Sequence, residues 1–407
     1  MIHVCYGLHD RDGRYSKFTG TSMLSIFENT SAPSHSITVH ILHDSTLSQS
    51  NHDKFVEIAE KYKQNVEFFN VEIFCMDKIQ FVLQKLKQYV QSRFSIGAFY
   101  RLMVNQKSFH EKISKMIYLD SDTIVNLDIQ ELWDYPMEEY AVASVPELWA
   151  TRSYMVRNKY LLNSGKVKVE DYFCSGVLVL NFDKLEEDFF YKGVNWLAEN
   201  LQCECPDQDI LNYFFSTNYC KLPEKFDLFV GIAKQQDKNI VYKNIYHYSG
   251  LSLGLDMKNA HDKLFFDCFM KTSWFDIDFI EHISQIMKQI YNEQKNFAVQ
   301  ISAAISGKKR AFFVMPNDIE TVKKIFQISD EEEIIVATSN ESIDNLIESM
   351  KNSGGKKIYF IVISTPGFDS LLTNAGFKAG KDFINAMVML PNNYGLQMPT
   401  QAIIKFL

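Results

Sequence analysis

The chain has 407 residues and a mass of 47.3 kDa, more than one hydrophobic core usually serves, so we expect two domains. Apolar residues make up 46% and charged residues 23%, proportions of a globular protein that exclude an intrinsically disordered chain. The net charge of −8 excludes a surface that attracts nucleic acid as a whole, so we expect no nucleic-acid partner.

The seven cysteines are an odd, scattered set, which indicates reduced thiols and a cytoplasmic protein. The first residues, Met1 to Tyr6, enter a strand-like run without the charged and apolar regions of an export signal. No window approaches the roughly 20 continuous apolar residues that a membrane span needs. We therefore expect a soluble cytoplasmic protein, with peripheral docking at a membrane left open.

Strand and helix patterns alternate from the start of the chain. The predicted elements are a strand over 2–6, a helix over 21–29, a strand over 37–42, a helix over 53–63, a strand over 66–73 and a helix over 77–90. Such alternation normally builds an α/β fold with a mainly parallel sheet, which binds ligands at the carboxyl ends of its strands.

A long one-faced helix is predicted over about 275–300, in a stretch without Gly or Pro. The alternation then restarts, with strands over 311–315, 333–337 and 357–364 and helices over 318–328, 342–350 and 369–375. We therefore predict a catalytic domain over 1–270, a helical connector over 271–306 and a small α/β accessory domain over 307–407.

The clearest chemical signal is Asp120-Ser121-Asp122, which follows an apolar strand. Side chains alternate along an extended chain, so the two carboxylates can lean to the same side of the strand end. Convergent hard oxygen ligands suit Mg²⁺ or Mn²⁺, above all when phosphate oxygens complete the coordination. The alternative is a simple turn, since Asp and Ser favour such positions.

Several further blocks accompany this tripeptide in a fixed order. They are Phe99-Tyr-Arg101-Leu, Leu127-Asp-Ile-Gln-Glu-Leu-Trp-Asp134, Tyr172-Phe-Cys174-Ser-Gly-Val-Leu-Val-Leu-Asn181, Pro206-Asp-Gln-Asp209 and Tyr246-His-Tyr-Ser-Gly250. Over residues 1–270 this order resembles the retaining glycosyltransferases of family 8, which include bacterial lipopolysaccharide glucosyl- and galactosyltransferases and glycogenin. The resemblance implies a nucleotide-sugar-binding, Rossmann-like catalytic domain of the GT-A type.

The resemblance also implies the metal site. Asp120 and Asp122 match the metal-binding D-x-D of the family, and His247 matches the late histidine that completes the protein ligands of Mn²⁺, with Mg²⁺ as the other candidate. A cation there would neutralise the leaving UDP as a Lewis acid. Taken alone, His247 would be read as a hydrogen-bonded loop histidine.

The same comparison assigns residues to the donor sugar. Arg101 matches a basic position that reaches this sugar, Asp207 matches the residue that selects its hydroxyls, and Gln208 matches the residue beside the anomeric carbon. The alternatives are a surface cation for Arg101 and a helix N-cap for Asp207 or Asp209.

Other donor contacts depart from the family pattern. Cys174 stands where the family usually has an Asn that bonds the sugar, and the family lysine after the His-x-x-Gly motif is missing at its usual offset, leaving Lys258 as the substitute. Tyr6 and Asp10 are candidates for the uracil and ribose. Two further residues, Ser121 and Gly250, complete the predicted donor-binding set.

We thus expect transfer of a hexose from a UDP-sugar, glucose before galactose, with retention of configuration. The acceptor is left open as a glycan, lipid-linked or protein-linked group, which the aromatic rings of Trp149, Tyr154 and Tyr160 are candidates to stack. The accessory domain lacks a G-x-G-x-x-G turn, so we expect it to serve as a scaffold or in homo-oligomer formation. The alternative is a degenerate nucleotide-sugar-binding or scaffold protein of glycan assembly.

Overall fold

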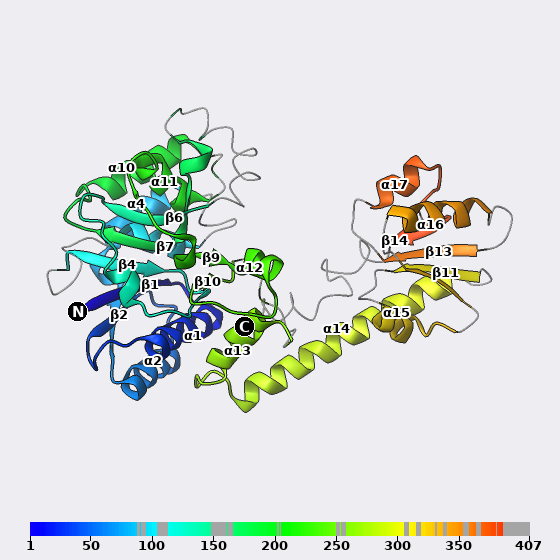
Figure 1. Ribbon diagram of the computed structural model, residues 1–407, viewed down its shortest axis with the longest axis horizontal. Coiled ribbons are helices and arrows are strands. Elements are labelled where there is room, and N and C mark those ends of the chain that lie inside the picture. Colours follow the sequence, from blue (N-terminus) through cyan, green and yellow to red (C-terminus); the bar gives the residue numbers. More distant parts are fainter. Residues whose placement is uncertain are drawn as a thin grey trace. The chain divides into compact units, whose positions relative to one another are not determined.

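Seven strands form the main sheet among the described residues of the first part of the chain (Figure 1), in the order β3-β2-β1-β4-β7-β6-β8. They are β1 (Ile2–Leu8), β2 (Ile37–His43), β3 (Asn65–Asn70), β4 (Lys115–Leu119), β6 (Val142–Pro146), β7 (Phe173–Asn181) and β8 (Cys220–Lys221). The pairs β1 with β2, β1 with β4, β2 with β3 and β6 with β8 are parallel, whereas β7 is antiparallel to β4 and β6. The expected α/β class is confirmed. The first four strands along the chain, β1 to β4, form the parallel half of the sheet.

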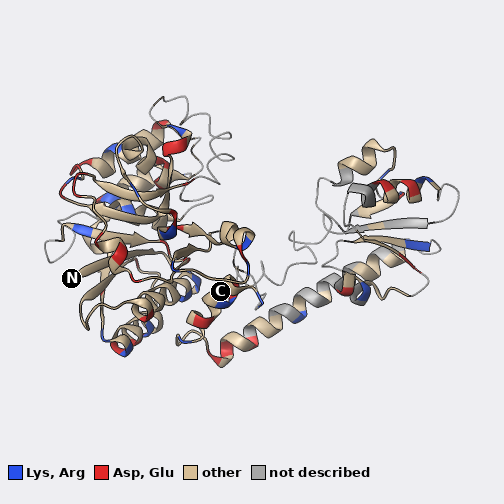
Figure 2. Cartoon of the chain, in the orientation of Figure 1, with Lys and Arg blue, Asp and Glu red and all other residues tan. Residues whose placement is uncertain are grey.

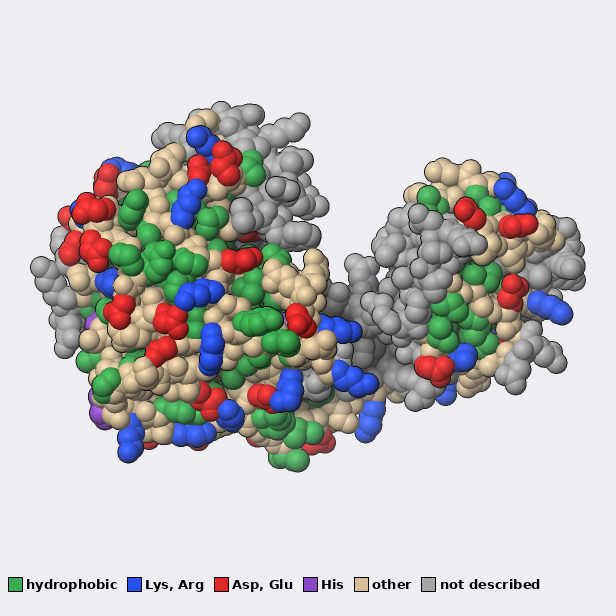
Figure 3. All heavy atoms as spheres, viewed as in Figure 1, with side chains coloured by type: hydrophobic (Ala, Val, Ile, Leu, Met, Phe, Trp, Pro, Cys, Tyr) green, Lys and Arg blue, Asp and Glu red, His purple; other side chains and the backbone are tan. Residues whose placement is uncertain are grey.

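The computed structural model describes residues 1–87, 90, 95–103, 113–147, 161, 165, 167–201, 203, 205–249, 253, 258–304, 309–314, 319–329, 332–336, 340–352, 358–363, 368–379 and 381–385. The chain divides into two compact units, residues 1–276 and 277–406. The three-part division predicted from the sequence stays a prediction. Both signs of charge are interspersed in each unit (Figure 2), and the face drawn in Figure 3 mixes them with apolar side chains.

The strand order reverses beside β1. From β1 the chain moves out to β2 and β3 and then returns to β4 on the other side of β1. Connections that leave neighbouring parallel strands in opposite directions open a crevice at the carboxyl ends of those strands, where α/β proteins bind ligands. Because β1 ends at Leu8 and β4 ends at Leu119, Asp120 is the first residue beyond β4 at this crevice.

A second, small sheet of the described residues brings distant segments to the same place. It has the order β5-β10-β9, with β5 at Thr123–Val125, β10 at Ile245–His247 and β9 at Leu228–Phe229. In the antiparallel pair of β10 and β5, His247 lies opposite Thr123. The backbone register therefore fixes His247 next to the segment that carries Asp120 and Asp122.

Helices cover both faces of the main sheet. Those described in the first unit are α1 (Arg14–Asn29), α2 (Gln49–Tyr62), α3 (Val71–Phe74), α4 (Met76–Lys85), α6 (Tyr100–Met103), α7 (Gln130–Trp133), α10 (Phe189–Glu199), α11 (Pro206–Phe215), α12 (Val230–Gln236) and α13 (Ala260–Phe269). Short 3₁₀ turns occupy Ile96–Phe99, Val169–Asp171 and Glu224–Phe226.

Trp274 closes the first unit after α13. Its ring lies 5.1 Å from the ring of Phe55 on α2, and its indole nitrogen donates a hydrogen bond of 2.9 Å to Asn51. On α1, a Cβ built on Gly20 would come within 2.1 Å of the Trp274 ring, so only glycine allows this approach. One aromatic side chain thus joins the C-terminal end of the unit to its first two helices.

The second unit has its own sheet of four described strands, all parallel, in the order β12-β11-β13-β14. They are β11 (Lys309–Val314), β12 (Glu333–Val336), β13 (Ile358–Ile363) and β14 (Phe383–Asn385), and the helices are α14 (Ile277–Ala304), α15 (Ile319–Phe326), α16 (Asn340–Asn352) and α17 (Phe368–Asn374).

Side chains of β11 alternate between two hydrophobic clusters, as expected for a sheet covered on both faces. Phe312 packs in a cluster with Ala298 of α14 and Val322 of α15, whereas Phe313 packs in a cluster with Leu346 of α16 and Leu372 of α17. The end of the long helix α14 therefore belongs to the core of the second unit. Among the described helices, none combines the length and apolar character needed to cross a membrane.

Candidate active site

Asp120, Asp122 and His247 come together at the end of β4. Their ligand atoms all lie within 4.8 Å of one another, and Nε2 of His247 is 3.3 Å from Oδ1 of Asp122. The side chains of Asp120 and Asp122 are 25% and 35% exposed, whereas that of His247 is 6% exposed. The two carboxylates are therefore partly exposed to solvent, whereas the imidazole beside them is buried. This arrangement leaves the carboxylates accessible to an incoming ligand.

Gly176 on β7 makes this approach possible. A Cβ at this position would lie 2.3 Å from Cε1 of His247 and 3.2 Å from Oδ2 of Asp120. The backbone oxygen of Gly176 also accepts a hydrogen bond of 2.7 Å from the Asp120 amide. The site thus requires a residue without a side chain at position 176, between two of the clustered groups.

The other nitrogen of His247 is held by a buried carboxylate. Nδ1 lies 3.0 Å from Oδ1 of Asp227, whose side chain is 0% exposed, and the imidazole stacks on Phe229 at 5.0 Å. A carboxylate on one ring nitrogen orients the lone pair of the other toward a metal, as is common for histidine ligands. Asp227 and Phe229 therefore aim Nε2 of His247 at Asp122.

The donor set fits a divalent cation. Two carboxylates and one imidazole are ligands that Mn²⁺ and Mg²⁺ accept in proteins. Burial lowers the pKa of His247, but the Asp227 and Asp122 charges outweigh it and raise this pKa well above its ordinary value. Burial raises the pKa of Asp122, but His247 outweighs it and lowers that pKa. The raised pKa of His247 reports the negative charge of the carboxylates around it, which favours a bound cation.

Arg101, on α6, bridges Asp120 and the α11 residue Asp207. Its Nη2 donates a hydrogen bond of 2.6 Å to Asp120, and its Nε is 3.1 Å from Oδ2 of Asp207, at an angle that makes an ion pair without a hydrogen bond. Nη1 donates to the Ser175 carbonyl, at 2.6 Å, and the guanidinium lies 4.5 Å from the Tyr118 ring centroid.

The Arg101 side chain is only 8% exposed, so it is not the surface cation that the sequence left as an alternative. Burial lowers the pKa of Arg101, but the charges of Asp120 and Asp207 outweigh it and raise this pKa. Arg101 is therefore a fixed positive charge between two carboxylates of the site.

Gln208, on α11, has its amide clamped on both sides. Its Oε1 accepts hydrogen bonds from the Ser175 amide, at 2.9 Å, and from the Ser175 hydroxyl, at 3.2 Å. Its Nε2 donates to Glu147, at 2.7 Å, and to the hydroxyl of Tyr172, at 3.0 Å. Both lone-pair directions of the amide oxygen are thus directed at Ser175, while the amide hydrogens are directed at Glu147 and Tyr172.

The remaining predicted donor contacts lie in other surroundings. Tyr6 is fully buried, with its hydroxyl 2.8 Å from that of Ser22. Asp10 accepts hydrogen bonds from the Tyr15 amide and the Ser16 hydroxyl at the start of α1 and from the side-chain amide of Asn51 on α2.

The Ser121 hydroxyl accepts a hydrogen bond of 2.8 Å from Thr19, and Lys258 is exposed just before α13. Among these four residues only Ser121 adjoins the clustered carboxylates, because it lies between Asp120 and Asp122. Gly250 and the predicted acceptor residues Trp149, Tyr154 and Tyr160 lie outside the described residues.

Sequence reasoning missed two acidic residues of the site. Asp227 follows a 3₁₀ turn and Glu147 follows β6. Neither residue lies within a sequence motif or at a characteristic spacing from one. Burial raises the pKa of Glu147 to about 7. Their common signal is structural, since each bonds a residue that the sequence did single out: Asp227 bonds His247, and Glu147 bonds Gln208.

The fold is that of the GT-A glycosyltransferases. A model of glycosyl transferase family 8 matches residues 8–252, more than half of the chain, and the chain belongs to this family. The resemblance stated from the sequence blocks is thereby confirmed.

Three curated relatives illustrate the range of the family. The chain is 30% identical to a protein of Haemophilus influenzae named "Putative glycosyltransferase", over 53% of this chain and 59% of that protein. It is 24% identical to General stress protein A of Bacillus subtilis, over 49% of this chain and 62% of that protein. It is 25% identical to the lipopolysaccharide 1,2-glucosyltransferase of Escherichia coli, over 62% of this chain and 72% of that protein. The chain thus spans less than two thirds of the first two relatives.

Solved structures show the same fold. The galactosyltransferase LgtC, in complex with donor and acceptor sugar analogues, is 17% identical and superposes with a TM-score of 0.53, over 67% of this chain and 96% of that one. An active-site mutant of LgtC gives a TM-score of 0.54 at 18% identity, with the same coverage of both chains. At this identity the likeness shows the fold alone.

Proposed function

We propose that this protein transfers a hexose from a UDP-hexose to a hydroxyl of a glycan, glycolipid or glycoprotein acceptor, with retention of configuration and dependence on Mn²⁺ or, less well, Mg²⁺. One observation carries the proposal: Asp120, Asp122 and His247 converge at the end of β4, within 4.8 Å, although 125 positions separate Asp122 from His247. Without this convergence, the proposal would rest on the family membership alone.

In this proposal Asp120, Asp122 and Nε2 of His247 hold the cation, which supplies Lewis-acid neutralisation of the diphosphate as UDP leaves. The protein contributes the orientation of these groups. Asp227 holds the imidazole through Nδ1, and Arg101 holds the Asp120 carboxylate through Nη2. Groups fixed before the substrate arrives need no rearrangement when charge develops on the leaving group.

Asp207 is proposed to select the donor sugar. It is buried, pairs with Arg101 and has its Oδ2 3.4 Å from the Ser175 hydroxyl oxygen. A buried carboxylate built to bond a sugar hydroxyl discriminates strongly against an analogue without that hydroxyl, because the carboxylate is then left without its partner. Arg101 fixes the position of this carboxylate.

Gln208 is proposed to lie beside the anomeric carbon. Its Oε1 accepts two hydrogen bonds from Ser175, so any stabilisation of an oxocarbenium-like carbon by this oxygen requires the amide to release Ser175 when the donor binds. Glu147 and Tyr172 would then hold the amide through its nitrogen. Retention would follow if the acceptor attacks the face from which UDP departs.

Glucose is the preferred donor in this proposal and galactose is the next candidate. The names of the similar proteins support these two sugars, since one is a lipopolysaccharide glucosyltransferase and the LgtC structure is that of a galactosyltransferase. A cytoplasmic location, peripheral membrane contact and homo-oligomers through the second unit stay predictions.

The test is UDP release by the purified full chain with UDP-glucose, UDP-galactose and their N-acetylated forms, with and without Mn²⁺. Metal-dependent release is expected, and Asp122→Asn should lower it by about 100-fold because it removes a ligand charge. Asp53→Asn, at an exposed position on α2, is the control that should keep the activity.

No release with any donor, or equal release by the Asp122→Asn variant, would contradict the proposal and favour the degenerate nucleotide-sugar-binding protein. Retention is tested separately, by NMR of the anomeric proton of the product. An inverted linkage would contradict the proposed same-face attack while leaving hexosyl transfer in place.

A further inference from the structure

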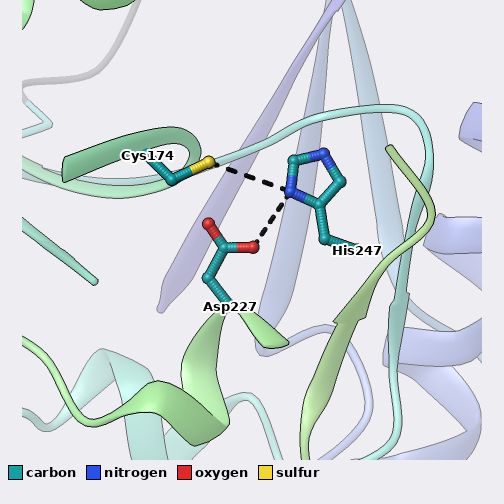
Figure 4. A group of neighbouring side chains, drawn as sticks. All are labelled: Cys174, Asp227 and His247. Atoms are coloured by element: carbon teal, nitrogen blue, oxygen red, sulfur yellow. Dashed lines mark hydrogen bonds and ion pairs between the residues drawn. The ribbon is translucent and has the colours of Figure 1, made fainter. Parts of the chain in front are cut away.

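Two side chains approach the same nitrogen of His247. Nδ1 lies 3.0 Å from Oδ1 of Asp227 and 3.9 Å from Sγ of Cys174, and both side chains point at it (Figure 4). A ring nitrogen carries either one proton or one lone pair, so it makes one good hydrogen bond and not two. One proton therefore cannot serve all three groups, whereas a cation between them could.

Asp227 gives independent support for a bound ligand, because one of its carboxylate oxygens has no hydrogen-bond partner among the described residues. This oxygen is Oδ2, and the side chain is 0% exposed. A buried carboxylate oxygen without a partner is costly, and its presence calls for a bound group. The Sγ of Cys174 accepts a hydrogen bond of 3.4 Å from the Gly176 amide, so the sulfur has a lone pair directed at a backbone donor.

A cavity adjoins these groups. It has a volume of about 200 Å³ and is lined by Glu147, Cys174 and Asp227 together with apolar side chains that include Val145, Leu222 and Phe229. Polar atoms and this much space suffice for a bound ion and a water molecule. The acidic residues and the thiol thus open onto the same space.

We propose that Cys174, Asp227 and Nδ1 of His247 form a second cation site, for a thiophilic divalent ion of the Zn²⁺ class. A sulfur, a nitrogen and a carboxylate oxygen form a Zn²⁺ donor set. Tetrahedral Zn²⁺ with bonds of about 2.3 Å to sulfur and about 2.0 Å to nitrogen and oxygen places S and N about 3.6 Å apart and N and O about 3.3 Å apart. The observed 3.9 and 3.0 Å lie within a few tenths of an ångström of these separations. The cavity supplies room for water as the fourth ligand.

The site shares its imidazole with the proposed Mn²⁺ site. A cation at Nδ1 leaves the one remaining ring proton on Nε2, and the protons displaced from Nδ1 and from the Cys174 thiol pass to solvent as the metal–nitrogen and metal–sulfur bonds form. Nε2 would then donate to Asp122 in place of ligating Mn²⁺. The two cations therefore compete through one side chain. This competition rests on the proposed function, whereas the thiolate site does not.

The site is tested with Co²⁺ as a spectroscopic probe on the full chain. A thiolate-to-cobalt charge-transfer band is expected in the near ultraviolet, displaced by Zn²⁺. Cys174→Ser and Asp227→Asn should each abolish it, whereas Cys75→Ser, at a buried cysteine elsewhere, should keep it. Thermal melting of each variant shows that it is folded, and Asp227→Asn provides a second route if Cys174→Ser does not fold. No band in the natural protein, or a band that survives Cys174→Ser, would overturn the site.

The competition is tested by adding Mn²⁺ to the cobalt-loaded protein. Linkage is reciprocal, so Mn²⁺ at its own site should weaken the charge-transfer band, and Asp122→Asn should remove this sensitivity. The paramagnetic resonance of free Mn²⁺ reports independently whether Mn²⁺ has bound. Bound Mn²⁺ with an unchanged band would overturn the competition, whereas failure to bind Mn²⁺ at all would instead count against the proposed catalytic metal.

Discussion

At the scale of single residues, Gly176→Ala should disable the proposed metal site. Its Cβ would fall 2.3 Å from Cε1 of His247, so the imidazole or β7 must shift, and the fit of the three ligands is lost. We expect Mn²⁺ affinity to fall at least about tenfold and the free energy of unfolding to fall by about 1–3 kcal/mol.

Gly231→Ala is the matched control for Gly176→Ala, because a Cβ on Gly231 of α12 would meet nothing within 4 Å. Metal titration and thermal melting are measured on both variants. Equal Mn²⁺ affinity in the two would show that the close approach at position 176 is unimportant.

The D-x-D motif and the late histidine could be predicted from the sequence because each has a recognisable pattern. The side chains that orient them could not. Asp227 follows a 3₁₀ turn and Glu147 follows β6, and their roles appear only when His247 and Gln208 are placed in space. For Tyr6, the sequence does not tell which face of β1 the ring takes, and in the structure this ring is fully buried.

Glu147 should make stability depend on pH. Burial raises its pKa from 4.5 to about 7, so the protein favours the protonated form. The stability that this group contributes is fully present below pH 4.5 and is lost as the pH rises to about 7, a loss of up to about 3 kcal/mol. Glu147→Gln keeps a neutral group that still accepts a hydrogen bond from Gln208.

The free energy of unfolding of the natural protein should therefore fall relative to that of Glu147→Gln as the pH rises from 5 to 7. Once Glu147 is ionised, at higher pH, the difference between the two proteins should stay constant. Urea unfolding at several pH values measures the effect, with Glu139→Gln at an exposed position as the control. Parallel profiles of the natural protein and Glu147→Gln would argue against a neutral Glu147.

At the scale of elements, the strands and helices of the parallel half could be predicted, but their ends could not. The helix expected over 21–29 begins at Arg14, seven residues earlier. Apart from Phe18, its first half buries small residues, Ser16, Thr19 and Gly20, which give no apolar periodicity. The hydroxyl of Thr19 bonds the Tyr15 carbonyl and Ser121, which satisfies it inside the fold, and such pairing is invisible in the sequence.

Gly20→Ala should weaken the packing of α1 on Trp274. The new Cβ would lie 2.1 Å from the indole, which must move away from Phe55 and Asn51. We expect a loss of about 1–3 kcal/mol and a red shift of tryptophan emission as Trp274 gains contact with water. Calorimetry and fluorescence measure the two effects.

A double-mutant cycle separates this clash from a general loss of glycine. Because Trp274→Leu removes the ring that the Cβ would meet, Gly20→Ala should cost less in that background. An equal cost in both backgrounds would place the effect elsewhere in α1.

At the scale of the whole molecule, each unit contains hydrophobic clusters of its own. We expect the full chain to unfold in two calorimetric transitions, because separate cores melt separately unless a large apolar interface joins them. Adding Mn²⁺ with UDP should raise the midpoint of one transition and leave the other in place, since the proposed ligands all lie within residues 1–276. A single transition that shifts as a whole would show one cooperative unit.

The pairing of β5 with β10 determines when the site can form during folding. His247 faces Thr123 across a contact that spans more than 120 positions of the chain. Contacts of such separation form late, because a long loop must first be closed. During synthesis, a nascent chain that has exposed Asp120 and Asp122 still lacks its imidazole until residue 247 has left the ribosome. Tight capture of the cation would then mark a finished catalytic unit, and a prematurely terminated chain would be without it.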